Sequence, residues 1–178
     1  AEQGWPAVGG KAEWGFVKLG HTDPTRSNSG LQALLSMTEE YWGRSKLAVP
    51  DLLDAKYQAF FKSIERGVTK FETSTGTFMT DMVRFGPSKY DIAVVYESLA
   101  VSQLENARGR WGNLRLYYPP TTQWSDHPGA VLQAPWVTPP QKAAARTWLR
   151  FLRAKEAQER ALRLGFRPAD ASVPIRND

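Results

Sequence analysis

The segment from His21 to Gly30 holds the side chains of this chain that are best suited to binding a small polar molecule. It lies between a short apolar run, residues 16–19, and an amphipathic stretch that begins at Leu31. A strand followed by a hydroxyl-rich loop and a helix start is a geometry that captures anions, because the first helical N–H groups lack partners within the helix and lie at the positive end of its dipole. The small residues Ser27, Ser29 and Gly30 let a ligand approach the backbone closely. Ordinary capping of the helix, without any ligand, is the alternative.

A second group of small hydroxyl residues, Ser74 to Thr77, opens another expected helix. We expect Ser74 and Thr75 to contact a ligand there, with simple hydroxyl capping as the alternative. Tyr96 and Glu97 end an apolar run that is typical of a buried parallel strand. In α/β sheets ligands bind beyond the carboxyl ends of the strands, so both residues would lie near these loops. Tyr96 either faces the ligand or is a half-buried aromatic at the rim.

Catalytic chemistry has little support in the sequence. The chain has two histidines, His21 and His127. Either could form part of a hydrolytic triad with a neighbouring aspartate, and this remains a weaker alternative. The Gly-x-Ser-x-Gly elbow, the Gly-rich phosphate loop and a His-x-x-x-His pair are all absent. We therefore expect no catalytic residues, no metal site and no cofactor.

Composition narrows the possible partners. The chain of 178 residues is long enough for one globular domain with a core, and 42% of its residues are hydrophobic. It has no cysteine, which excludes disulfides and thiolate metal sites. The net charge of +5 does not indicate nucleic-acid binding. Much of the basic excess lies near the C-terminus, where Lys142, Arg146 and Arg150 are spaced by four residues and are interpreted as the solvated face of an amphipathic helix. The other basic residues of this region are Arg153, Lys155, Arg160, Arg163 and Arg167.

The periodicity of apolar residues predicts alternating strands and helices, and hence an α/β class. Residues 1–13 are expected to form an irregular lead-in, residues 14–168 the domain and residues 169–178 a frayed tail. The expected strands cover residues 15–20, 90–96, 114–118 and 130–134, and the expected helices cover residues 31–42, 51–66, 77–85, 98–107, 138–153 and 154–164. The helix after Thr138 is expected to bury Ala144, Trp148, Phe151 and Leu152.

Six segments, taken in order, match those of a known family: Trp14-Gly15, residues 19–24, residues 27–31, residues 90–97, Ala157-Gln158 and residues 165–168. These segments resemble bacterial extracellular solute-binding proteins of the two-lobed, type 2 periplasmic kind, in particular the molybdate- and sulfate-type group. The chain is also similar to a branch that occurs alongside von Willebrand factor A domains.

The resemblance implies a three-layer α/β/α lobe with a mixed central sheet, which forms one half of a ligand cleft. It implies ligand contacts at Thr25, Ser27, Asn28, Ser29 and Gly30, and a cleft position for Tyr96. The implied role is capture of an oxyanion or small polar solute for an ABC-type importer or a sensor, outside the cytoplasm and anchored to the membrane in the full-length protein.

The segments also imply that this chain is a second lobe with the returning C-terminal elements, lacking most of the first lobe. The hinge and cleft surface exposed on such a fragment would be unusually apolar, which favours self-association. The principal alternative function is a non-catalytic interaction module at the cell surface, for instance beside a von Willebrand factor A domain.

Overall fold

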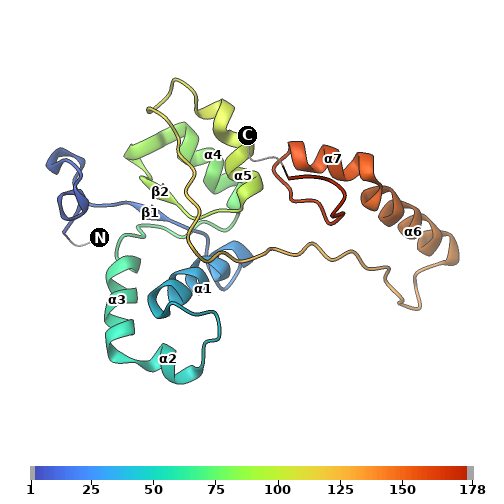
Figure 1. The fold of residues 1–178 in the computed structure, drawn as a ribbon, viewed down its shortest axis with the longest axis horizontal. Coiled ribbons are helices and arrows are strands. Elements are labelled where there is room, and N and C mark those ends of the chain that lie inside the picture. Colours follow the sequence, from blue (N-terminus) through green and yellow to red (C-terminus); the bar gives the residue numbers. More distant parts are fainter. Residues whose placement is uncertain (1–2, 176–178) are drawn as a thin grey trace. The chain divides into compact units, whose positions relative to one another are not determined.

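The computed structural model describes residues 3–175, and the chain divides after Gln123 into two compact units. The first unit contains the sheet and most of the helices. They are α1 (Asn28–Trp42), α2 (Val49–Leu53), α3 (Ala55–Glu65), α4 (Thr75–Phe85) and α5 (Glu97–Ala107), with the short 3-10 helices η1 (Trp5–Val8), η2 (Ala12–Trp14) and η3 (Gly86–Ser88) (Figure 1). The second unit contains α6 (Pro139–Arg153) and α7 (Lys155–Arg163).

The sheet is small and parallel. Strand β1 (Leu19–Gly20) pairs with β2 (Ile92–Ala93), and parallel bridges from Leu19 to Val68 and from Thr22 to Glu72 add a third extended segment. Helices pack around these parallel strands, so the α/β class is confirmed. Every strand pairing within residues 3–175 is parallel, and the sheet is narrower than expected.

Two of the expected strands are irregular segments. Residues 114–118 alternate in polarity and residues 130–134 are mostly apolar, but neither segment has regular secondary structure. A strand needs a neighbour for its backbone hydrogen bonds, and Tyr117 remains 80% exposed. The expectation of strands at these two places is therefore wrong.

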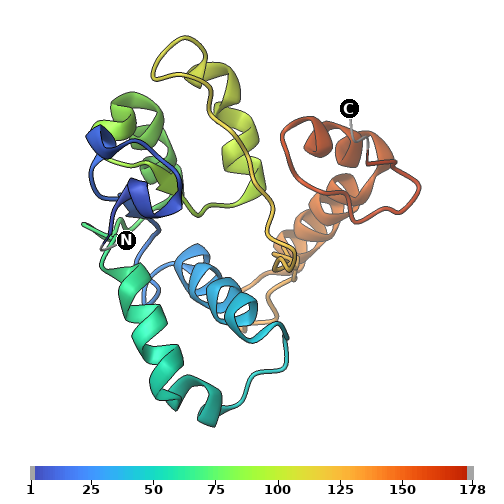
Figure 2. The same cartoon turned by 60° about the vertical axis from the view of Figure 1, so that its left-hand side comes forward.

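The helix boundaries mostly follow local signals. Gly43 ends α1 in the left-handed conformation, with φ of 61°. The expected single helix over residues 51–66 is wrong, because the helical conformation is interrupted at Asp54. The Asp54 side chain caps the following helix by accepting from the Tyr57 N–H at 2.8 Å. Figure 2 shows α1 and α3 side by side. The Tyr41 ring of α1 and the Phe60 ring of α3 lie 4.7 Å apart.

The core of the first unit lies against β1. The Phe78 and Tyr90 rings are fully buried and meet edge to face at 4.8 Å. Both rings lie over Gly20, where a Cβ atom would stand only 2.5 Å from the Phe78 ring. A glycine in the strand is therefore what allows these two aromatic side chains to pack on the sheet.

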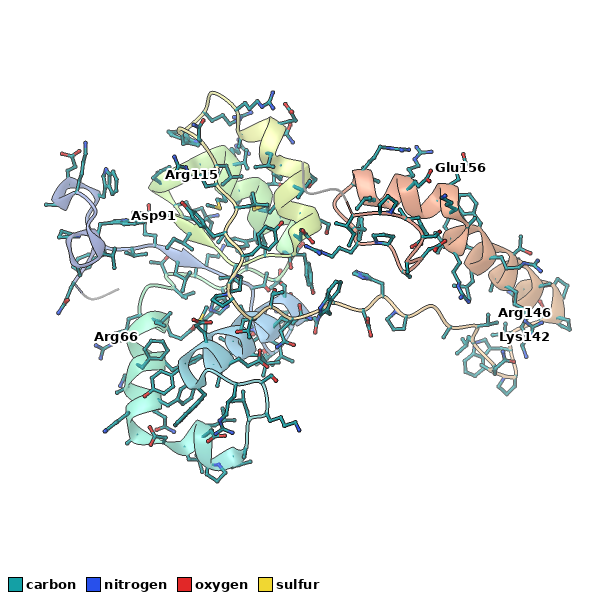
Figure 3. The ribbon with its side chains drawn as sticks, viewed as in Figure 1. Arg66, Asp91, Arg115, Lys142, Arg146 and Glu156 are labelled. Carbon is teal, nitrogen blue, oxygen red and sulfur yellow. The ribbon has the colours of Figure 1, made fainter. Side chains whose placement is uncertain are left out.

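Asp91, which directly precedes β2, holds Trp5 and Lys18 through its carboxylate (Figure 3). Its Oδ2 atom accepts hydrogen bonds from the Lys18 N–H at 2.8 Å and from the Trp5 Nε1–H at 3.2 Å. The Lys18 ammonium lies 3.1 Å from the same oxygen, and the Asp91 side chain is only 8% exposed. The expected irregular lead-in therefore includes two 3-10 helices and is held by a specific acceptor.

Replacement of Asp91 by alanine is expected to lower the free energy of unfolding by about 1–3 kcal/mol, because it leaves two donors without their acceptor. Urea denaturation followed by tryptophan fluorescence measures the loss. Asp126→Ala, at an exposed position, is the matched control and should change stability by less than about 0.5 kcal/mol. Equal effects of the two substitutions would contradict this account of Asp91.

The second unit exposes an apolar helix face. A capping box begins α6, in which the Thr138 N–H donates to the Gln141 side chain at 2.8 Å. The expected buried stripe on this helix is wrong: Trp148 and Phe151 are more than half exposed and stack on each other at 5.3 Å, Leu152 is 40% exposed, and Ala144 is also exposed. The second unit, as far as the structure describes it, has no sheet to cover these side chains. In the expected frayed tail Val173 is buried, and residues 176–178 lie outside the described residues.

Candidate functional site

Three helix N-termini meet in the first unit (Figure 1). The Ser29 hydroxyl of α1 lies 2.6 Å from the Thr75 hydroxyl at the start of α4. The Asn28 amide of α1 donates to the Tyr96 hydroxyl, which precedes α5, at 3.2 Å. These two contacts join positions 46 and 68 residues apart and bring together four of the residues that the sequence singles out.

The Ser29 hydroxyl is the centre of a group of hydroxyls in which Thr22, Ser29 and Thr75 are buried and Ser27 is half-buried. Its oxygen lies 2.7 Å from that of Thr22, 3.2 Å from that of Ser27 and 2.6 Å from that of Thr75. We call these four residues the hydroxyl cluster. A hydroxyl has one proton and two lone pairs, so three partners use the full capacity of Ser29. Ser29 therefore orients its neighbours, which retain capacity of their own.

The first turn of α1 leaves its N–H groups directed out of the helix. The first bond within this helix runs from the Leu31 N–H to the Ser27 carbonyl, so the N–H groups of Asn28, Ser29 and Gly30 have no intrahelical acceptor. The Ser27 side chain makes no capping bond, in contrast to the capping alternative. Ser74 does cap its helix, since its hydroxyl accepts from the Thr77 N–H at 3.4 Å.

Gly30 is required by close packing in the loop. A Cβ atom at this position would lie 2.1 Å from the Thr22 carbonyl oxygen and 2.9 Å from the Pro24 nitrogen. Both are backbone atoms, so a side chain here would displace the loop that carries the hydroxyl cluster.

Thr25 and Glu97 make other contacts. The Asp23 carboxylate accepts from both the Thr25 hydroxyl, at 2.7 Å, and the Thr25 N–H, at 2.9 Å. These hydrogen bonds lower the pKa of Asp23 below its usual value. The Glu97 carboxylate accepts from the Tyr118 hydroxyl at 2.7 Å.

The two histidines lie in different surroundings, and His21 is not available as a catalytic base. His21 is fully buried, with Nδ1 2.9 Å from the Thr22 carbonyl oxygen and Nε2 3.1 Å from the Glu65 carboxylate. Because both ring nitrogens are occupied, His21 has none left to deprotonate a nucleophile. His127 is exposed, and its ring meets the edge of Phe166 at 5.8 Å. Among residues 3–175 no group of three acidic or histidine side chains could hold a metal ion.

Comparison with known families identifies this chain. The family described as bacterial extracellular solute-binding protein matches residues 4–167, and the chain belongs to this family. A search of curated proteins and a search of solved structures found no match. Membership indicates a ligand-binding role and a location outside the cytoplasm, in a family that is generally not catalytic. No helix in the described part of the chain is long and apolar enough to cross a bilayer.

Thr22 and Glu65 were not expected from the sequence. Thr22 is the second residue after β1, and its place in the hydroxyl-rich segment that follows the strand was the signal that could have identified it. Glu65 lies 44 residues from His21, and no local pattern predicts that contact.

Proposed function

We propose that the N-termini of α1, α4 and α5 bind an oxyanion or a small polar solute. The hydrogen bond between Asn28 and Tyr96, together with the contact between Ser29 and Thr75, is the observation that carries this proposal. Three helix dipoles then direct partial positive charge to one place, which stabilises a negative ligand without a lysine or arginine.

The side chains around this place have donors to offer. Tyr96 accepts from Asn28, so its own O–H remains for a ligand. The Asn28 amide has a second N–H, and the Ser27 and Thr75 hydroxyls can rotate toward a bound oxygen. We assign the N–H groups of Asn28, Ser29 and Gly30 to the ligand as well.

The remaining candidates have more limited roles in this proposal. Ser74 holds the start of α4 by capping, and Thr25 shapes the loop through Asp23. Glu97 has only acceptor oxygens, which suit a hydroxyl or N–H of the solute and repel a bare anion. We further propose that the solute passes to an ABC-type importer or a sensor, which family membership supports.

Calorimetric titration of the protein with molybdate, tungstate, sulfate and phosphate tests the proposal. We expect saturable binding of at least one of these ions. Thr75→Val and Tyr96→Phe each remove one donor and should weaken that binding about tenfold, which corresponds to about 1.4 kcal/mol.

Two matched variants serve as controls for this titration. Thr80→Val changes an exposed threonine of the same helix, whose hydroxyl donates to the Gly76 carbonyl, and Tyr117→Phe changes a tyrosine that is 80% exposed. Both should bind as the unsubstituted protein does. No binding of any of the four ions, or equal affinity for Thr75→Val and Thr80→Val, would reject the proposed site.

A further inference from the structure

The pair formed by buried His21 and half-buried Glu65 has no part in the ligand contacts proposed above, yet it adjoins the hydroxyl cluster. His21 Nδ1 contacts the carbonyl of Thr22, whose hydroxyl is a member of that cluster. Glu65 is the last residue of α3 and contacts Nε2 with both carboxylate oxygens, at 3.1 and 3.3 Å. Two hydrogen bonds therefore lead from the Glu65 carboxylate to Thr22, and a third leads on to Ser29.

Both neighbours of the His21 ring are hydrogen-bond acceptors. A backbone carbonyl and an ionised carboxylate have no proton to donate. A neutral imidazole carries one N–H and can satisfy only one of them, whereas an imidazolium carries two and satisfies both. The observed arrangement therefore fits His21 in its protonated form.

The surroundings of the ring also favour the proton. Burial alone lowers the pKa of His21, but the hydrogen bond to Glu65, the Thr22 carbonyl and the charge of Glu65 together raise it above the ordinary value. The Phe71 ring covers another side at 5.2 Å.

Two further carboxylates on neighbouring segments have partners of their own. Asp23 accepts from Thr25. Glu72 is bonded to Lys70, Lys89 and Tyr90, and these contacts lower its pKa. Among the described residues, Glu65 is therefore the carboxylate whose hydrogen bond and charge raise the pKa of His21.

We propose that His21 and Glu65 are positioning residues, which hold Thr22 and the hydroxyl cluster in the binding arrangement only while His21 carries its proton. The binding consequence rests on the proposed function of the cluster. Deprotonation sets a ring lone pair against an acceptor, so the contact with Thr22 or the contact with Glu65 must open. The Thr22 carbonyl packs closely on the backbone at Gly30, since a Cβ atom added there would lie only 2.1 Å from its oxygen, so a shift of Thr22 also changes its contact with the first turn of α1.

The direction of the pH effect follows from the raised pKa of His21. The stabilisation of the folded protein by the His21–Glu65 pair is fully present below the ordinary histidine pKa. It is lost as the pH rises through the higher pKa that His21 has in the folded protein. We therefore expect the hydroxyl cluster to be ordered on the acidic side and the solute to bind more tightly there.

Amide NMR spectra across a pH titration test the positioning role without any solute. We expect the N–H signals of Ser29 and Thr75 to shift with the midpoint at which the His21 ring titrates. In Thr22→Val, which removes the hydroxyl but keeps the shape, His21 should still titrate while the Thr75 shift loses at least half of its amplitude. In His21→Gln both signals should stay constant, and His127→Gln, at an exposed position, should leave the coupling intact. The proposal would be overturned if the Thr75 amide signal did not shift with the titration of His21. It would also be overturned if that shift had the same amplitude in Thr22→Val as in the unsubstituted protein.

Sulfate affinity over the same pH range tests the consequence for binding. We expect affinity to fall about tenfold from the acidic to the alkaline side in the unsubstituted protein and to stay flat in His21→Gln. If sulfate binds with equal affinity throughout, the proton dependence is rejected while the proposed function stands. If no oxyanion binds and the amide signals still follow His21, the positioning role is supported and the anion site is rejected.

Discussion

The Phe78→Ala variant is expected to lose about 3–5 kcal/mol of its free energy of unfolding, the largest effect of the substitutions considered for this chain. Phe78 has no exposed surface and packs edge to face on Tyr90. Its ring also covers Gly20 in β1, so alanine would leave a cavity against the sheet. The variant would lose both the favourable free energy of burying the ring and the van der Waals contacts that the ring makes.

Urea denaturation measures this loss directly. Phe16→Ala is the matched control because Phe16 is 69% exposed, and it should change the free energy of unfolding by less than about 0.5 kcal/mol. Similar denaturation midpoints for the two variants would show that Phe78 does not form the core described here.

Gly30→Ala is expected to cost about 1–3 kcal/mol and to abolish solute binding. The added methyl group would meet the backbone of Thr22 and Pro24, which cannot rotate away as a side chain can. Relief requires movement of the loop that carries Thr22 and Ser27, and the hydroxyl cluster would come apart with it.

Gly76→Ala provides a matched comparison within the same site. Gly76 also lies in the first turn of a helix, but the nearest atom to its added Cβ would be the Ser74 oxygen at 4.0 Å. Alanine there should be neutral or stabilise the protein by about 0.4–1 kcal/mol. If thermal denaturation found Gly30→Ala as stable as Gly76→Ala, the close packing of the loop would be refuted.

Local signals predicted the starts of the helices of the site to within three residues. The expected helices began at residues 31, 77 and 98, and α1, α4 and α5 begin at Asn28, Thr75 and Glu97, directly after Ser27, Ser74 and Tyr96. These signals act within one helical turn, so they are visible in a single sequence. The convergence of the three starts was expected only from the general rule for ligand sites in α/β sheets.

The pairing of particular side chains could not be predicted in this way. The contacts of Ser29 with Thr75 and of His21 with Glu65 span 46 and 44 residues. Periodicity carries no information about contacts at such separations. For the same reason His21 was considered as a catalytic base, whereas its two acceptor neighbours fix it as a buried structural group.

The errors in the fold have similar physical causes. The segment 114–118 alternates as a strand does, but alternation does not supply a neighbouring strand. The apolar face of α6 has helical spacing, but spacing does not supply a layer to cover Trp148 and Phe151. The apolar pattern continues through Asp54 and predicts one helix. The Asp54 side chain instead caps a new helix start, which divides the expected helix into α2 and α3.

A crystal of the protein soaked in tungstate gives the most direct test of the proposed anion site, because tungsten scatters anomalously and marks the position of the ion. We expect one strong anomalous peak within hydrogen-bonding distance of Asn28, Thr75 and Tyr96, which should be absent in crystals of Thr75→Val soaked at the same concentration. A peak confined to the arginines of α6, or no peak at all in crystals that diffract well, would contradict the proposed site.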